Sequence, residues 1–250
     1  MKHIRLLIES PSIKPNSTIE INDNDFNYLF NVMRKKIGDK LLVFNGLDGQ
    51  WLAKIIEINK KNCLIEIISQ TKPQYFPPKI ILAFAPVKNA RIDFIAAKAT
   101  ELGITRFQPI ITQHTIVDKI NLERFKANAK EAAEQCERLD LPEIFEPIKL
   151  NSFLKKLQKN QILILCDESG TGKKASEVLS KIQTSNQSEI IIFIGPEGGF
   201  SKTEFEQFDQ ADNLHKITLG PRILRADTAI ISAITLVQEF LGDFDLKPNF

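Results

Sequence analysis

Charged side chains beside two glycine-rich loops are the residues of this sequence with the clearest capacity for chemistry. Residues 195–201 read Gly-Pro-Glu-Gly-Gly-Phe-Ser, and residues 220–225 read Gly-Pro-Arg-Ile-Leu-Arg. Glycines let backbone amides approach a ligand closely, because no Cβ stands in the way. Glu197 adds negative charge to the first loop, and Arg222 and Arg225 add positive charge to the second. The two loops therefore predict a ligand-binding crevice with acidic and basic groups in its walls.

Each loop follows an apolar strand and precedes a helix. Residues 190–194 are four isoleucines and a phenylalanine, and such a short apolar run predicts a strand buried on both faces, as in a parallel sheet. Ser201 and Glu204 then fit a capping box that begins a helix. Residues 216–219 predict the second strand, followed by a helix over residues 226–241. Because ligands of open α/β sheets bind at the carboxyl ends of strands, we expect both loops to line one site.

Several familiar sites are excluded by spacing. Residues 167–174 resemble a phosphate-binding loop, but Asp167 takes the place of the required first glycine and Lys174 that of the Ser or Thr. A nucleotide hydrolase is therefore not supported, although this loop follows a predicted strand and is placed to border the site. The sequence GPEGG also lacks the G-x-G-x-x-G spacing of dinucleotide-binding loops. The histidines form no metal set and pair with no nucleophile, so we interpret them as structural or surface residues: His3, His114 and His215.

Composition sets the broad class. The chain has 250 residues and a net charge of +2, and residues 1–72 carry 11 Lys and Arg against 8 Asp and Glu. This mildly basic front permits nucleic-acid binding without requiring it. The three cysteines fit no disulfide or metal spacing, which indicates a reducing compartment and hence the cytoplasm. No cleavable signal and no apolar run near the ~20 residues of a membrane span is present, so we expect no membrane association.

The pattern of apolar residues divides the chain in two. Residues 1–72 predict a small β-barrel of five strands with one helix over residues 23–34; the strands are 3–8, 18–21, 40–44, 50–58 and 62–68. Three prolines in residues 71–78 predict a stiff linker. Residues 73–250 alternate strands and helices, which predicts an α/β domain with a largely parallel sheet; besides the elements above, these are strands 80–85, 106–111 and 161–166 and helices 91–102, 121–139 and 174–181.

Longer motifs carry a resemblance to a known family. Residues 194–204 read IGPEGGFSKTE, and residues 219–233 read LGPRILRADTAIISA. Upstream stand KNAR at 88–91, KATELG at 98–103 and EAAEQCER at 131–138, with VMRKKIGD at 32–39 nearer the front. In this order, over nearly the whole chain, the motifs resemble the RsmE family of ribosomal RNA methyltransferases, within the SPOUT class. The paired loop motifs are the specific part of the resemblance.

The resemblance implies both fold and activity. Residues 1–72 would form a PUA-like RNA-binding β-barrel, and residues 73–250 a SPOUT α/β domain with a deep trefoil knot, which periodicity alone cannot reveal. The cofactor would be S-adenosyl-L-methionine bound in the knot, with no metal. The protein would be a homodimer joined through the knotted domains. Its substrate would be a uridine of 16S ribosomal RNA in the small ribosomal subunit, methylated at N3.

Roles for individual residues follow from the same resemblance. Arg225 would contact the uracil oxygens, and Glu197 or Asp227 would take the N3 proton or anchor the loops. The cofactor would be held by the two loops, at Ile194, Gly195, Pro196, Glu197, Gly198, Gly199, Leu219, Gly220, Ile223 and Leu224. Contacts to RNA would come from Arg5, Arg34, Lys35, Lys36, Lys88 and Arg91.

Two departures from the family pattern and two alternatives stay open. The family commonly has Thr-Glu where this chain has Ala226-Asp227, and a His-Leu pair where this chain has Tyr28-Leu29. The first alternative is a SPOUT methyltransferase that acts on tRNA or 23S ribosomal RNA. The second is a non-catalytic RNA-binding or ribosome-assembly factor, against which the intact glycine loops argue.

Overall fold

The computed structural model describes residues 3–117, 119–185 and 187–247. Its contacts divide the chain into two compact units, the first made of Met1–Phe76 with Ala133–Leu141 and the second of Pro77–Ala132 with Pro142–Phe250. The sequence predicts a boundary after residue 72, and no local pattern in it indicates that residues 133–141 group with the first unit. Within the described part of the chain, no helix combines the length and the hydropathy that a bilayer-spanning segment needs.

The first unit is built on a five-stranded sheet in the order β1-β3-β4-β5-β2, with β1 parallel to β3 and the other pairs antiparallel. All five predicted strands are present. Inward-facing aliphatic side chains alternate with exposed ones along β3, β4 and β5, which gives this unit its own core. Its elements are β1 Arg5–Leu7, β2 Thr18–Asn22, α1 Asp23–Asn27, the π-helical turn η1 Tyr28–Val32, β3 Lys40–Phe44, β4 Gln50–Ile58 and β5 Asn62–Lys72.

The predicted helix over residues 23–34 is shorter and less regular than expected. It begins as α1, continues as the π-helical turn η1 and ends at Val32. Arg34 ends it, because its φ of +53° lies in the left-handed region that a right-handed helix cannot contain.

Arg5 is buried in the first unit, with 6% of its surface exposed. Its Nε donates to Gln50 Oε1 at 2.6 Å, and its Nη1 donates to the carbonyls of Ala133 and Glu134 at 3.1 and 2.9 Å. Its Nη2 donates to the carbonyl of Arg138 at 2.6 Å. Burial lowers the pKa of this guanidinium, while nearby acidic groups raise it and partly offset the effect of burial. These contacts favour a structural role for Arg5 over the phosphate contact expected from the resemblance.

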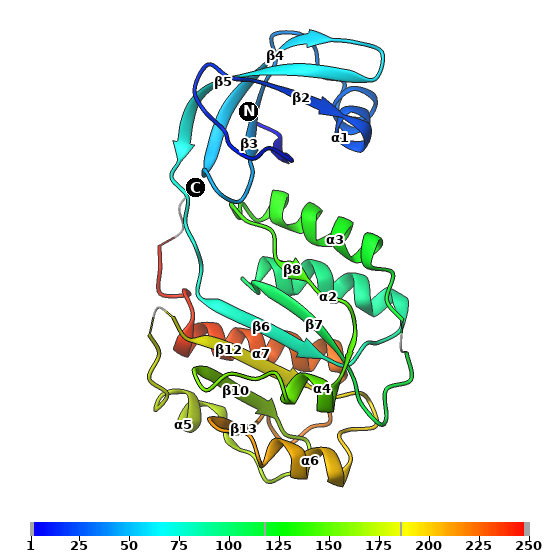
Figure 1. The fold of residues 1–250 in the computed structure, drawn as a ribbon, viewed down its shortest axis with the longest axis vertical. Helices are drawn as coiled ribbons and strands as arrows, with labels where there is room; N and C mark the ends of the chain where they lie inside the picture. The colour runs from blue at the N-terminus through cyan, green and yellow to red at the C-terminus, as the bar shows by residue number, and fades with distance from the viewer. Residues whose placement is uncertain (1–2, 118, 186, 248–250) are drawn as a thin grey trace. The chain divides into compact units, whose positions relative to one another are not determined.

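The second unit is built on a parallel sheet in the order β11-β13-β10-β12-β6-β7-β8, with β9 also paired to β7 (Figure 1). Every pairing in it is parallel, as predicted. Its strands are β6 Lys79–Phe84, β7 Arg106–Ile111, β8 Glu143–Ile144, β9 Ile148–Lys149, β10 Gln161–Cys166, β11 Lys173–Lys174, β12 Glu189–Ile194 and β13 Leu214–Thr218. Its helices are α2 Asn89–Glu101, α3 Leu122–Gln135, α4 Leu150–Leu154, α5 Ala175–Leu179, α6 Lys202–Phe208 and α7 Ala226–Leu241.

Most predicted elements of the second unit are confirmed, and the differences have local causes. The helix over residues 226–241 and the strands over 106–111 and 161–166 have the predicted bounds. The helix predicted to run to residue 139 ends at Gln135, and Glu137 beyond it has a φ of +66°. The sequence analysis did not find β8, β9, β11 and α4, which are too short to show a period.

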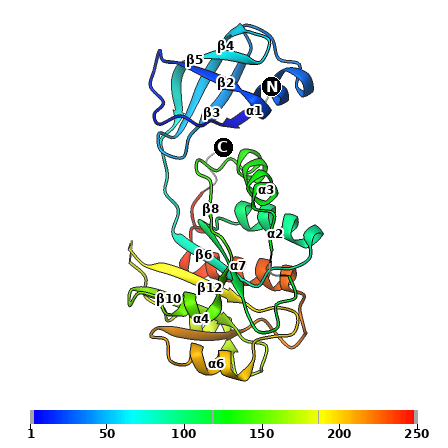
Figure 2. The ribbon, with the colours of Figure 1, turned by 45° about the vertical axis from the view of Figure 1, so that its right-hand side comes forward.

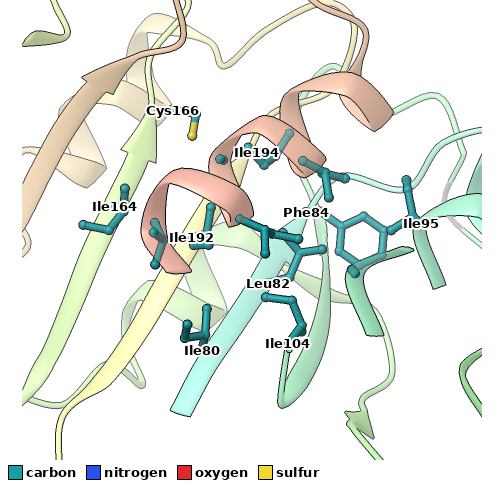
Figure 3. Close-up of a cluster of buried hydrophobic side chains, with 14 of the residues drawn as sticks. Ile80, Leu82, Phe84, Ile95, Ile104, Ile164, Cys166, Ile192 and Ile194 are labelled. Atoms are coloured by element: carbon teal, nitrogen blue, oxygen red, sulfur yellow. The ribbon is translucent and has the colours of Figure 1, made fainter. Parts of the chain in front are cut away.

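Helices cover both faces of the parallel sheet. Alternate side chains of β6, β10 and β12 pack beneath α7 on one face, as Figure 3 shows for Ile80, Leu82, Ile164 and Ile192. The other alternate side chains, among them Phe193, pack against α4 and α6 on the opposite face. Figure 2 shows these two helices beside the sheet. A strand buried on both faces must be apolar throughout, which explains the unbroken run over residues 190–194.

We expect Arg5→Ala to destabilise the first unit by about 3 kcal/mol or more, because it leaves buried carbonyl groups without their donor. Trp51, the chain's one tryptophan, lies in the same unit and reports its unfolding by fluorescence in urea. Arg34→Ala is the control, since it removes the same side chain from an exposed position. Equal stability of the two variants would show that Arg5 is not a structural residue.

Candidate functional site

A cavity of about 630 Å³ lies at the carboxyl ends of three neighbouring strands of the second unit. Strands β13, β10 and β12 are adjacent in the sheet, so the loops that follow them converge at one edge. The volume suits a small organic ligand or cofactor. The loops contribute the lining residues, which are Cys166, Asp167, Glu168, Gly170, Ile194, Gly195, Pro196, Glu197, Gly199, Thr218, Leu219, Gly220, Pro221, Arg222, Ile223, Leu224, Ala226 and Ala229.

The structure brings most of the predicted site residues together. All the residues expected to hold a cofactor line the cavity except Gly198. Arg225 is exposed directly before α7, and Asp227 is half-buried in its first turn, and neither lines the cavity. Ile223 lines it, yet its side chain is fully exposed, with a relative exposure of 104%. The loop after β10 borders the site although its sequence fails as a phosphate-binding loop.

The loop over residues 195–201 is held from the β10 side by Glu168. The Oε1 atom of Glu168 accepts a hydrogen bond from the backbone N–H of Phe200 at 2.8 Å. Gly199, which directly precedes Phe200, has a φ of +70°. A Cβ built on Gly199 would lie 2.6 Å from Glu168 Oε1. Glycine is therefore favoured at position 199 by its backbone angle, and a Cβ there would displace the carboxylate of Glu168.

The same loop is held at its far end by Glu204. Ser201 and Glu204 form the predicted capping box, with Ser201 N–H donating to Glu204 Oε2 at 2.8 Å and Glu204 N–H donating to Ser201 Oγ at 3.3 Å. The other carboxylate oxygen, Oε1, accepts from the N–H of Gln113 at 2.8 Å. Glu204 is buried, so one carboxylate ties the turn after β7 to the start of α6.

His114 holds the glycine pair. Its Nδ1 lies 3.0 Å from the carbonyl oxygens of both Gly198 and Gly199. A carbonyl can only accept, so Nδ1 carries the proton. The sequence analysis interpreted His114 as structural or surface. Its partners lie 84 and 85 residues away, so no local pattern could have linked them.

The loop after β10 is an internally bonded turn. Asp167, 5% exposed, accepts from Ser169 N–H at 2.7 Å and from Thr171 Oγ at 2.6 Å. Burial alone would raise the pKa of Asp167, but these hydrogen bonds and the charge of Lys216 bring it below the ordinary value. Burial raises the pKa of the neighbouring Cys166 thiol, which therefore stays protonated and is not a nucleophile.

A small groove adjoins the cavity, because Pro196 and Glu197 line both. Glu197 forms an ion pair with Arg91, and Lys88 stands immediately before α2. The groove is lined by Pro86, Val87, Lys88, His114, Ile116, Val117, Pro196 and Glu197. Two of the residues predicted to bind RNA, Lys88 and Arg91, thus lie beside the predicted loop.

The other predicted RNA-binding residues lie in the first unit. Arg34 and Lys36 are exposed and Lys35 is partly so. The aliphatic side chains of Val32 and Ile37 beside them are also exposed, at 60% and 62%. This segment, residues 32–37, therefore presents three cations together with apolar surface.

Comparison with known families and sequences gives consistent matches along the chain. Residues 74–238 match the model of an RNA methyltransferase domain, and residues 21–68 match that of an RNA methyltransferase PUA domain. A ribosomal RNA small subunit methyltransferase E of Rickettsia conorii is 37% identical over 239 residues, which covers 95% of this chain and 96% of the relative. A Bacillus subtilis protein of the same name is 27% identical, with 95% and 96% covered.

Solved structures agree with these matches. A ribosomal RNA small subunit methyltransferase E from Neisseria gonorrhoeae, bound to S-adenosyl methionine, is similar with a TM-score of 0.85 and 28% identity, covering 97% of this chain and 100% of that one. A putative methyltransferase from Legionella pneumophila, in complex with the same cofactor, also has a TM-score of 0.85, at 29% identity, covering 98% of this chain and 100% of that one.

We expect Gly199→Ala to destabilise the second unit by about 1–3 kcal/mol, because the strained φ and the loss of the Glu168–Phe200 hydrogen bond add together. Chemical denaturation followed by circular dichroism measures the change. Gly170→Ala is the matched control, since Gly170 has a φ of +87° with nothing within 4 Å of the added Cβ. The amount by which Gly199→Ala destabilises the unit more than Gly170→Ala does should vanish when Glu168 is also replaced by Ala. If that difference persists in the Glu168→Ala background, the steric explanation is wrong.

Proposed function

The chain belongs to the RsmE family of ribosomal RNA small subunit methyltransferases, and we propose that it transfers the methyl group of S-adenosylmethionine to N3 of a uridine in 16S ribosomal RNA. The observation that carries this proposal is the cavity of about 630 Å³ where the loops after β10, β12 and β13 meet. The family implies the SPOUT fold, with its deep trefoil knot, for the second unit and a PUA-like barrel for the first.

The cavity fits S-adenosylmethionine in size and chemistry. The aliphatic side chains of Leu219, Leu224 and Ala229 offer apolar contacts to the adenine ring. Gly195 and Gly220 line the cavity without a side chain, so a ligand can approach the backbone there closely. S-adenosylmethionine supplies a methyl group already activated by its sulfonium, so the protein's task is to bring a nucleophile to it.

Uracil N3 is a poor nucleophile until its proton leaves. Catalysis therefore needs positioning, removal of that proton, and stabilisation of the negative charge that spreads onto O2 and O4. We assign the last role to Arg225, whose guanidinium stays charged at neutral pH and makes a poor base. Its place beside Ala226, which lines the cavity, supports this assignment.

Glu197 and Asp227 are each assigned the expected role of proton acceptor or loop anchor. Different contacts support the assignment for each residue. Glu197 lines both the cavity and the groove, and its ion pair with Arg91 fixes the first loop. Asp227 stays in the first turn of α7, where its carboxylate accepts from the N–H of Thr228 at 3.1 Å. Anchoring is thus the better supported role for both.

RNA binding is assigned to cations of both units. Arg34, Lys35 and Lys36 would contact phosphates, which adds salt-dependent affinity and little sequence specificity. Val32 and Ile37, exposed beside them, offer apolar contact to unstacked bases. In the second unit, Lys88 and Arg91 would hold the strand that carries the target base.

The protein would act as a homodimer in the cytoplasm. The fully exposed Ile223 and the exposed Phe240 of α7 supply apolar surface on the second unit for a second copy. Cys63 and Cys166 are buried free thiols, which suits a reducing compartment.

The alternatives differ in substrate or in catalysis. A SPOUT enzyme for tRNA or 23S ribosomal RNA would use the same cavity with another RNA surface, and a non-catalytic assembly factor would not need it. The names of the relatives favour the small subunit.

The function is tested by nucleoside mass spectrometry of 16S ribosomal RNA from cells that lack the gene. We expect 3-methyluridine to be lost on deletion and restored by the wild type but not by Arg225→Ala. Calorimetry should show that Arg225→Ala still binds S-adenosylmethionine, because the arginine acts on the base. An unchanged 16S profile would redirect the search to tRNA and 23S RNA, and lost cofactor binding would refute the role of Arg225.

The RNA contact of the first unit is tested by the salt dependence of binding. We expect Lys35→Ala with Lys36→Ala to reduce the slope of log K against log salt by about 1 for each phosphate that the variant no longer neutralises. Lys60→Ala with Lys61→Ala removes the same charge from another exposed pair and serves as the control. Identical slopes for the two double variants would exclude residues 35 and 36 from the interface.

A further inference from the structure

His114 has chemistry that its contacts leave unused. Because Nδ1 donates to the carbonyls of Gly198 and Gly199, the neutral ring carries its proton there and its lone pair on Nε2. Among the residues that the structure describes, none forms a hydrogen bond with Nε2. His114 is exposed on the groove, so this basic nitrogen is accessible to a ligand.

The position of the groove relates this nitrogen to methyl transfer. The groove lies among the loops after β6, β7 and β12, which are neighbours in the sheet. It shares Pro196 and Glu197 with the cavity. The groove has a volume of about 20 Å³, room for about one water, so a flat base can lie over its mouth and turn one edge toward it, next to a ligand that fills the cavity. Lys88 also lines the groove and supplies a cation beside such a base.

We propose that this groove receives the Watson–Crick edge of the extruded target uracil, and that His114 Nε2 is the acceptor of its N3 proton. The proposal rests on the proposed function. The target base has to leave its stack to reach such a site.

The proton and electron balance is simple. The N3–H bond breaks and its proton passes to Nε2, which converts His114 to an imidazolium. The electron pair left on N3 forms the new bond to the methyl carbon, while the carbon–sulfur bond breaks and its electron pair stays on sulfur. The products are 3-methyluridine, S-adenosylhomocysteine and one proton, which the imidazolium later releases to solvent.

The hydrogen-bond partners of the nearby acidic residues favour His114 over them as acceptor of the N3 proton. The Glu197 carboxylate already accepts from Arg91. Glu168 and Glu204 accept from backbone N–H groups of Phe200, Ser201 and Gln113. Lys88 is a cation at neutral pH and accepts no proton.

Two substitutions separate the two nitrogens of His114. In His114→Asn the side-chain amide stands near the place of Nδ1 and can still donate to Gly198 and Gly199, but no base replaces Nε2. His114→Ala removes both functions. We expect calorimetry to show wild-type affinity for S-adenosylmethionine in His114→Asn and weaker affinity in His114→Ala, since only the latter frees the glycine pair.

The single-turnover rate at saturating cofactor tests the base itself. In the wild type the rate should rise with pH on the acidic side of neutrality, as expected for a reaction that uses a general base. His114→Asn should be slower by about 100-fold or more at neutral pH and should lack that rise. RNA with 5-fluorouridine at the target position, whose N3 is more acidic, should restore most of the lost rate.

Each failure has its own signature. If the wild type makes no 3-methyluridine in 16S RNA, the proposed function is wrong. If the wild type is active and His114→Asn matches it in rate and pH profile, the function stands and the proton acceptor lies elsewhere. An Asn variant that is slow on both uridine and 5-fluorouridine RNA to the same degree would assign His114 a positioning role and overturn the proposal.

Discussion

Parallel pairing of the three neighbouring strands β10, β12 and β13 is the constraint on which the rest of the second unit depends. Leu163 of β10 pairs with Ile191 of β12 on one side and with Leu214 of β13 on the other. Because all three strands run the same way, their carboxyl ends reach one edge together, and the loops that follow can only meet there. Burial on both faces drives the pairing of β10 with β12. The cavity is thus a consequence of the sheet.

The loop after β12 is fixed by contacts from outside itself. Glu168 comes from the β10 loop, Gln113 and His114 from the turn after β7, and Arg91 from α2. Each contact uses the backbone or the charge of the loop, and the side chains of His114 and Glu168 pack directly against Gly198 and Gly199. A loop held in this way is organised before its ligand arrives, so binding does not have to supply the free energy of ordering it. Preorganisation of this kind also suits a reaction that depends on placing a nucleophile in line.

The sequence predicted those features that have a local cause. The apolar run over residues 190–194, the capping box at Ser201 and the helix over residues 226–241 each follow from neighbouring residues, and each is confirmed. The contacts of Arg5 and His114 could not be predicted, because their partners are backbone carbonyls that carry no signature in the sequence and lie up to 133 residues away. The cavity was predicted as a meeting of two loops with the loop after β10 at its border, and residues of all three loops line it.

Ile223 is a fully exposed aliphatic side chain in the lining of the cavity. Its side chain is fully exposed on the rim of a cavity whose other aliphatic residues are largely covered. Burying such a side chain is worth about 1.5–3 kcal/mol, so its exposure is a cost that a partner surface would remove. Arg225, two residues further on, is exposed as well. A second copy of the chain or the bound RNA could cover Ile223. The same surface would then also restrict Arg225, the residue to which we assign charge stabilisation, and so link the covering of Ile223 to catalysis.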